Sequence, residues 1–309
     1  MPTTGFPYPL DPVTVSGTTI TLDQYVNAPT VRNRRIADIA GQEFFASKIF
    51  SNGGGVEGGA ILFERPNPLL TDLYASRRTQ QMAPGTEAPI LTFERGVPMV
   101  ALPREIGGKW SLTRQERKRN NPRLAENAMT QLGNTIARDL EIMALSEINA
   151  VITATSRTFA GTQTLAAAAA TTFNTRTANN QPAADIARLT ATVHNEQRGR
   201  RLNSVIYNTL DWATMVAIHG ANGATEGNAG ARAMLAASGI TTVDVSVQQA
   251  AGSAIFYEAG QVGVWGNEFP IRTIQWIDEQ EDEKWWSQTT VSPCYAIDNQ
   301  FALMRLTGL

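Results

Sequence analysis

The sequence predicts an α+β fold, in which one long helix and a set of long strands accompany a region where short helices and strands alternate. Three observations support this prediction. Apolar residues recur every four positions over residues 121–151, a spacing typical of a helix. Short helical and strand patterns take turns between residues 182 and 269, and β-prone segments dominate residues 270–306. One class of secondary structure therefore does not account for this chain.

Length and composition limit the classes of protein further. A chain of 309 residues predicts one large domain or two closely joined ones. Charged residues make up only 17%, below the roughly 25% of typical soluble domains. So little charge indicates a large core or a surface that other chains cover. The net charge of −2 excludes a strongly basic nucleic-acid binder and an acidic disordered tail.

Residues suited to disulfides, metals and membranes are scarce. The single cysteine, Cys294, excludes an internal disulfide framework and a cysteine-rich zinc site. The two histidines, His194 and His219, leave little for a histidine-based metal site. The segment after Met1 lacks the features of a secretory signal, and no run of about 18 apolar residues could span a bilayer. We expect a protein of the cytosol or of a particle assembled there.

The N-terminal 64 residues predict an arm, a helix, a turn and a strand. Residues 1–30 are rich in proline and threonine and predict an extended arm with a brief strand. Its alternating positions are Val13, Val15, Thr19 and Thr21. Residues 31–50 have helical spacing. The glycine-rich residues 53–59 predict a flexible turn, and residues 60–64 predict a strand.

Residues 65–112 show no helical pattern and contain six prolines among β-prone segments. Proline removes a backbone donor, so these segments do not suit the centre of a sheet. A Pro-Gly turn lies within residues 82–89. We expect a long, partly exposed two-stranded excursion. Such a hairpin is barely stable alone in water and needs a surface to lie on.

The clearest helix follows. Asn121 is a plausible N-cap, and Pro122 suits the first helical position. A helix over residues 121–151 would be about 45 Å long at about 1.5 Å per residue. The Thr/Ala/Asn-rich residues 152–182 predict a linker.

The remainder predicts a mixed region and a β-rich end. Helices are expected at 186–193, 211–218 and 232–237, and strands at 204–207, 243–247, 254–257 and 262–265. The end predicts a strand near 271–277, an acidic turn at 278–283, a return strand over 285–297 and a last strand over 301–306.

No motif in the sequence predicts catalysis or a cofactor. Residues 53–58 match G-x-G-x-x-G, but a predicted helix precedes them and a strand follows, the reverse of a dinucleotide site. The Gly107 to Trp110 segment lacks the first glycine and the Ser/Thr of a P-loop. The acidic run at 278–283 could bind a cation, but a solvated hairpin tip is the better interpretation. Cys294 is interpreted as a small core residue. We expect no catalytic, cofactor-binding or metal-binding residue and no cofactor.

A basic segment is the most interesting charged feature. Only Glu105 and Glu116 oppose its positive residues. These are Arg104, Lys109, Arg114, Arg117, Lys118, Arg119 and Arg123. Such clusters attract phosphates without reading sequence. The alternative is salt bridging to neighbouring subunits or to the acidic turn, and the sequence leaves both open.

The order of these parts and five segments carry a resemblance to a known family. The segments are Asn27 to Thr30, Ala83 to Pro89, Gly107 to Thr113, Ala259 to Gly263 and Leu303 to Gly308. The chain resembles the major capsid proteins of tailed bacteriophages, which have the Hong-Kong-97-type fold, and is most similar to those of siphophages of actinobacteria.

The resemblance implies a role for each part of the chain. It assigns residues 1–50 to an N-terminal arm, 51–64 to a strand region of the peripheral domain, 65–112 to the extended β-hairpin loop, 113–151 to the peripheral spine helix, 152–269 to a connector and the axial α/β domain, 270–299 to the peripheral β-hairpin and 300–309 to a closing strand. The extended loop lies across an adjacent subunit in that family. Its tip would comprise Pro84, Gly85, Thr86 and Glu87.

The implied function is structural and not enzymatic. Hexamers and pentamers of the chain would form an icosahedral shell, a virion capsid assembled in the host bacterial cytoplasm, around double-stranded DNA bound without sequence specificity. The implied partners are a separate scaffolding protein, a portal and, as an optional addition, a decoration protein, with no membrane. Some family members crosslink through a lysine near the loop tip, but no lysine lies between Lys48 and Lys109. The alternatives are an encapsulin-like nanocompartment and, more distantly, an α/β enzyme with a hairpin lid.

Overall fold

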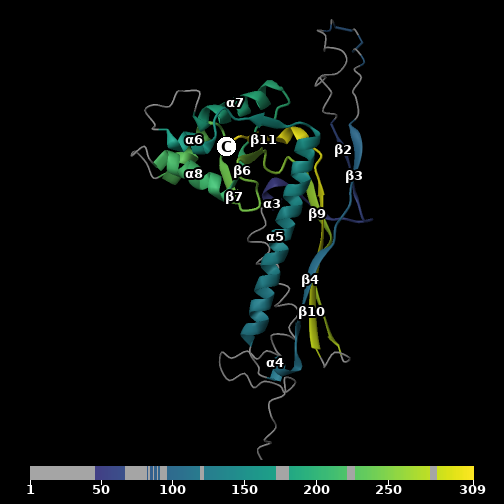
Figure 1. Ribbon diagram of the computed structural model, residues 1–309. Helices are drawn as coiled ribbons and strands as arrows, with labels where there is room; N and C mark the ends of the chain where they lie inside the picture. Colours follow the sequence, from purple (N-terminus) through teal and green to yellow (C-terminus); the bar gives the residue numbers. More distant parts are fainter. Residues whose placement is uncertain are drawn as a thin grey trace, which may run out of the picture.

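The computed structural model describes residues 46–66, 96–118, 122–171, 181–220, 227–278 and 284–309, together with residues 82, 84, 85, 87, 88 and 90. Figure 1 shows a long helix lying along a narrow sheet, with a second sheet and its helices at one end of that helix. The α+β prediction is confirmed.

A four-stranded sheet forms the elongated part of the molecule. Its strand order is β1 (Ser51–Gly55), β9 (Val264–Asp278), β10 (Lys284–Ala296) and β4 (Ile106–Leu112). The two longest strands, β9 and β10, pair antiparallel, and β4 pairs antiparallel with β10. β1 joins the other edge in parallel with β9. The return strand and its partner were expected, but β9 is longer than predicted.

Helix α5 (Pro122–Ala154) covers one face of this sheet, as Figure 1 shows. Its 33 residues correspond to about 50 Å at about 1.5 Å per residue. The four-residue repeat predicted this helix and its buried face. That face packs against the sheet through two apolar clusters, whose buried members are Leu112, Ala125, Met129, Ile136, Leu140 and Val291. The short helix α4 (Arg114–Lys118) connects β4 to α5.

A five-stranded sheet lies near the C-terminal end of α5 (Figure 1). Its order is β5 (Thr158–Ala160), β11 (Leu303–Thr307), β8 (Ser253–Tyr257), β6 (Ser204–Asn208) and β7 (Thr242–Ser246). Its helices are α6 (Leu165–Ala170), α7 (Pro182–Asn195), α8 (Thr209–Gly220) and α9 (Gly227–Ala237), and the 3-10 helix η3 (Gln300–Ala302) precedes β11. Strands and helices share one apolar core that includes Ile186, Leu189, Tyr207, Met215, Leu235 and Phe256.

The base of the predicted excursion is an antiparallel hairpin. β2 (Ile61–Arg65) pairs with β3 (Val97–Ala101), and Leu62 lies directly opposite Val100. Residues 67–81 and 91–95 of the excursion lie outside the described residues. The prediction is wrong at its end, because residues 106–112 form β4. Their alternation places Ile106, Trp110 and Leu112 on the face covered by α5.

The glycine-rich segment is also different from the prediction. Residues 51–55 form β1, and only the following residues turn. A Cβ atom on Gly53 would lie 2.3 Å from Cγ1 of Val264 on β9. A glycine is needed there because the two parallel strands approach too closely for a side chain.

The predicted linker contains regular structure as well. β5 pairs with β11, and Thr164 caps α6 by accepting a hydrogen bond from the Ala167 N–H at 3.2 Å. Composition concealed α6, because threonine at a helix N-cap and alanine within a helix look like a low-complexity run. Residues 1–45 of the predicted arm (residues 1–50), which include the start of its helix, lie outside the described residues, as do residues 279–283 of the acidic turn.

Candidate functional site

The predicted basic segment is divided between different parts of the fold. Arg104 precedes β4, and its Nη2 lies 3.1 Å from Oε1 of Glu147 on α5. Lys109 lies on β4, on the face opposite α5, with Nζ 4.6 Å from the ring centroid of Trp286. Arg104 therefore has a carboxylate partner within its own chain, and Lys109 has an aromatic one.

The rest of the basic segment follows β4. Arg114, Arg117 and Lys118 lie in α4, and Arg123 lies in the first turn of α5. Arg119 lies outside the described residues. The structure thus places these arginines and lysines near one end of α5 but does not join them with Arg104.

A capping box, which the sequence reasoning missed, holds the start of α4. The Thr113 N–H and Oγ1 donate to Oε2 of Glu116, at 2.9 and 2.8 Å, and the Glu116 N–H donates to Thr113 Oγ1 at 3.4 Å. The signal was present as the T-x-x-E pattern of residues 113–116. Glu116 is therefore engaged in ordering the helix and does not simply oppose the surrounding positive charge.

The face of the four-stranded sheet opposite α5 is rich in aromatic and cationic side chains. We call it the outer sheet face and define it by Lys109, Arg272, Ile274, Trp276, Trp286 and Gln288. The cross-strand register pairs Trp286 with Trp276, and Gln288 with both Ile274 and Lys109. The two tryptophan rings stack with centroids 6.4 Å apart. Ile274 is 48% exposed and Trp276 38% exposed, so this face leaves apolar surface uncovered.

The hairpin carries a second exposed apolar surface. We call it the hairpin stripe and define it by Leu62, Val100 and Leu102; Leu62 is 79% exposed and the other two are also exposed. A cavity of about 270 Å³ lies between the hairpin and α5; Phe63 and Met99 line it, and so do Val100 and Leu102 of the stripe. The hairpin therefore contributes little to the core of its own chain.

Polar contacts fix the root of this hairpin. The Arg65 Nε–H donates to the Ile297 carbonyl at 3.0 Å, and burial lowers the pKa of the Arg65 guanidinium. The Gln300 side-chain amide donates to the Pro66 carbonyl at 2.7 Å, and the Arg104 N–H donates to the Pro293 carbonyl at 3.1 Å. These contacts tie both strands to the segment around β10 and η3.

The predicted loop tip is only partly described. Pro84 and Gly85 form a turn in which Gly85 has a φ of +90°, a conformation that favours glycine. Both residues and Glu87 are exposed. Thr86 lies outside the described residues.

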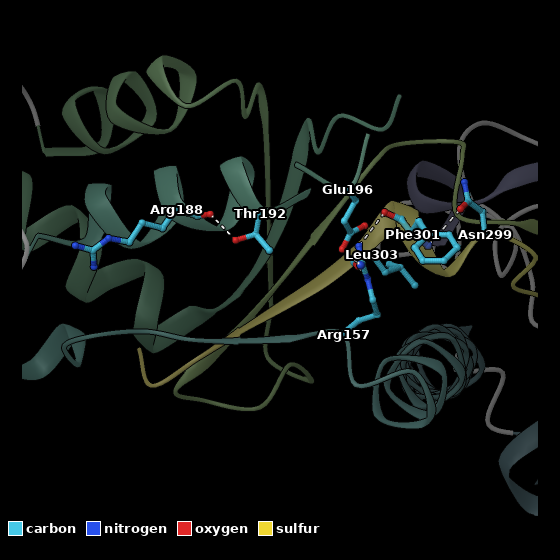
Figure 2. Close-up of polar contacts among 7 residues, drawn as sticks. All are labelled: Arg157, Arg188, Thr192, Glu196, Asn299, Phe301 and Leu303. Atoms are coloured by element: carbon cyan, nitrogen blue, oxygen red, sulfur yellow. Dashed lines mark hydrogen bonds and ion pairs between the residues drawn. The ribbon is translucent and has the colours of Figure 1, made fainter. Parts of the chain in front are cut away.

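A buried arginine joins α5 to the five-stranded sheet. Arg157, which is 7% exposed, lies three residues after the last residue of α5. Its Nε–H donates to the Leu303 carbonyl at 3.1 Å, and Nη2 donates to the Phe301 carbonyl at 3.3 Å. Nη1 forms an ion pair with Glu196 at the end of α7. Figure 2 shows the guanidinium pointing between Glu196 and the Phe301–Leu303 segment.

A second guanidinium completes this junction. Cζ of Arg198 lies 3.5 Å from the ring centroid of Phe301, and Cζ of Arg157 lies 5.3 Å from it. Burial lowers the pKa of Arg198. Figure 2 also shows Asn299, whose side-chain oxygen accepts from the Phe301 N–H at 3.2 Å. Sequence reasoning missed this junction, because its members come from three distant segments.

The isolated titratable residues occupy ordinary structural places. Cys294 is buried, as expected for a core residue, and burial raises the pKa of its thiol. His194 and His219 lie in the last turns of α7 and α8. Within the described ranges, no cluster of three or more His, Cys, Asp or Glu side chains could hold a metal ion. No helix in the described part of the chain combines the length and hydropathy that a membrane span requires.

Comparison with known proteins gives a clear result at the level of the fold. No protein-family model and no curated protein sequence matches the chain. Solved structures do. A virus-like particle from Pyrococcus furiosus matches with a TM-score of 0.55 and 11% identity, over 90% of this chain and 98% of that one. The capsid of cyanophage P-SCSP1u matches with a TM-score of 0.55 and 10% identity, over 83% and 86%.

A structure from Mycobacterium phage Adephagia resembles this chain about as well as the other two do. Its TM-score is 0.57 at 11% identity, and the match covers 84% of this chain and 87% of that one. The three matches cover between 83% and 90% of this chain. The chain therefore has the Hong-Kong-97-type capsid fold that its sequence predicted.

Proposed function

We propose that this chain is the major capsid protein of a tailed phage. Hexamers and pentamers of it would form an icosahedral shell that encloses double-stranded DNA. The observation that carries the proposal is the pair of exposed apolar surfaces, the hairpin stripe and the outer sheet face, on a fold shared with the cyanophage capsid and the Pyrococcus particle. The exposure of either apolar surface to water is unfavourable in free energy.

The two surfaces differ in shape and in chemistry. The hairpin stripe is narrow and aliphatic, whereas the outer sheet face is flat, aromatic and cationic. A contact between two different surfaces of identical chains is head-to-tail, and such contacts close into rings or extend into lattices. This is the kind of contact that a shell of one repeated chain requires.

Parts of the chain take their roles from this proposal. The four-stranded sheet with α5 would be the peripheral domain, and the five-stranded sheet with its helices the axial domain. The arginines and lysines of α4 and the start of α5 would meet packaged DNA or carboxylates of neighbouring subunits. The location would be the virion capsid, and scaffolding, portal and decoration proteins would be its partners.

Electron microscopy of the purified full-length protein tests the proposal. Closed shells or rings of six and five copies would support it, and particles that protect DNA from nuclease would distinguish a capsid from a compartment filled with protein cargo. Single chains at every concentration and salt condition would contradict it. A shell that encloses only protein would favour the encapsulin-like alternative.

A further inference from the structure

Strand β7 leaves one edge of the five-stranded sheet open. β6 pairs with one side of β7, and no strand in the described part of the chain pairs with the other side. An open edge presents backbone donors and acceptors that can pair with another strand. Natural edge strands are usually protected by outward charges, prolines or bulges. β7 has the sequence TVDVS, which contains no proline and a single charged residue, Asp244.

The side chains of β7 leave apolar surface beside that edge. Val245 is exposed, and Val247, just after the strand, is 75% exposed. The single charge of the strand, Asp244, is turned to the other face of the sheet. There it accepts hydrogen bonds from Lys48 Nζ at 2.5 Å and from the Tyr257 hydroxyl at 2.8 Å. Asp244 therefore does not keep a second strand away.

A cleft runs along β7. Its volume is about 560 Å³, and α5 forms the opposite wall with Asn134, Arg138 and Glu141. The Ser246 hydroxyl donates to the Glu141 carboxylate and connects the two walls. A strand added to the edge would direct alternate side chains into this cleft, because side chains of a strand alternate between its two faces.

The described chain begins beside the same edge. Ala46 is the first residue of helix α3 (Ala46–Ile49), and Lys48, two residues later, binds Asp244 of β7. The first described helix therefore lies next to the cleft, and 45 residues precede it in the sequence. Among them, residues 13–21 contain no charged residue, and seven of the nine are β-branched, a composition that favours an extended strand.

We infer that the open edge of β7 accepts residues 13–21 of a neighbouring copy as an additional strand. This inference rests on the proposed function. The segment between residues 21 and 46 can span up to about 80 Å, at about 3.3 Å per residue, so an arm can reach an adjacent subunit. In a closed shell each copy would donate one arm and receive another, so that no β7 edge would stay open. Main-chain pairing would supply affinity, and Val245 and Val247 would pack against the alternate side chains of the arm.

Hydrogen exchange of the full-length protein, in the assembled state that it adopts, tests this pairing. The backbone amides of residues 242–248 are compared in the parent and in a variant with Val15→Pro and Thr19→Pro, since proline removes strand donors. We expect exchange at 242–248 to be at least about tenfold faster in this variant. A control with Thr3→Pro and Thr4→Pro, outside the segment, should exchange like the parent. Equal exchange in all three proteins would overturn the inference.

Crosslinking then identifies which copy supplies the strand. Copies carrying Val15→Cys are mixed with copies carrying Val247→Cys, assembled and treated with a flexible bis-maleimide. A dimer band is expected. It should disappear when Val245→Lys is added to the acceptor and persist with Val245→Thr. Crosslinks that form only when both cysteines are in one chain would mean that the arm pairs with its own β7, and would overturn the inference that a neighbouring copy supplies it. Shells with unprotected residues 242–248 would refute this inference alone, whereas the absence of any assembly would refute the proposed function as well.

Discussion

Arg157 and Glu196 form an ion pair across the junction between the long helix and the five-stranded sheet. The two residues are 39 positions apart, and the guanidinium also binds the Phe301 and Leu303 carbonyls. Three segments of the chain therefore meet at one side chain. This contact joins the two halves of the molecule at a place where buried α5 residues such as Ile148 and Ile152 also pack against Ile206 and Ile255 of the five-stranded sheet.

Replacing Arg157 should destabilise the folded chain. Arg157→Gln leaves the Glu196 carboxylate and two carbonyls without their donor in a largely buried site, so the free energy of unfolding should fall by about 3 kcal/mol. Denaturant titration of the unassembled chain measures this. Arg188→Gln is the control, because Arg188 pairs with Asp185 at 3.4 Å from a 40% exposed position and should cost less than about 1 kcal/mol. Similar losses for both variants would contradict the assigned role of Arg157.

Gly53 and Gly55 offer a matched test of the parallel pairing between β1 and β9. Gly53→Ala places a Cβ atom against Val264 and should destabilise the chain by about 1–3 kcal/mol through overpacking. A Cβ on Gly55 would meet nothing within 4 Å, so Gly55→Ala should change stability by less than about 0.5 kcal/mol. Thermal unfolding of the two variants checks the difference. If both behave like the parent, β1 does not pack as the structure shows.

The hairpin stripe should matter for assembly and not for folding. Leu62→Asp places a charge on an exposed position, so the stability of the isolated chain should change by no more than about 0.5 kcal/mol. Shell yield should fall severalfold, because the charge would be desolvated in a contact between copies. Leu62→Val keeps the surface apolar and should assemble normally. Sedimentation and microscopy provide the readout, and normal shells from Leu62→Asp would exclude the stripe from the interface.

The basic residues around α4 should contribute to shell assembly or DNA retention through their positive charge. Replacing Arg117, Lys118 and Arg119 together by Gln should weaken assembly or DNA retention. Contacts made by exposed charges are screened by salt, so the parent should lose them as ionic strength rises and the variant should respond less. DNA content and shell yield are measured over a salt series. An identical response of both proteins would mean that this segment is only a solvated surface.

Mature particles should contain no covalent bonds between subunits. The exposed loop tip around Pro84 and Gly85 offers no amine, because no lysine lies between Lys48 and Lys109. Boiling purified particles in detergent with reductant should give a single band near 33.5 kDa. A ladder of covalent pentamers and hexamers would contradict this prediction.

The sequence predicted those parts of the fold whose pattern is local. The four-residue repeat identified α5, alternation identified β7, and β-prone runs identified the β9–β10 hairpin together with β6, β8 and β11. Its failures have physical causes. β1 was missed because a close approach between strands selects glycines, which otherwise indicate a turn. The elements within residues 152–182 were missed because Thr164 and the alanines of α6 resemble a linker.

The candidate surfaces were harder to predict than the fold. Alternation places Ile274 and Trp276 on one face of β9, but only the packing of α5 decides which face stays uncovered. The basic segment was identified as a continuous run, yet its members lie at separate places, and Arg104 is paired with Glu147. The Arg157 junction depends on contacts between distant segments, which carry no signature in a single sequence.

The position of β11 has a consequence for the order in which the chain can fold. This strand lies between β5 and β8 and comes after both of them in the sequence. During synthesis β5 and β8 leave the ribosome before the strand that separates them, so the five-stranded sheet cannot be completed until residues 303–307 have been made. Translation products that stop before β11 would lack the strand that pairs with both β5 and β8.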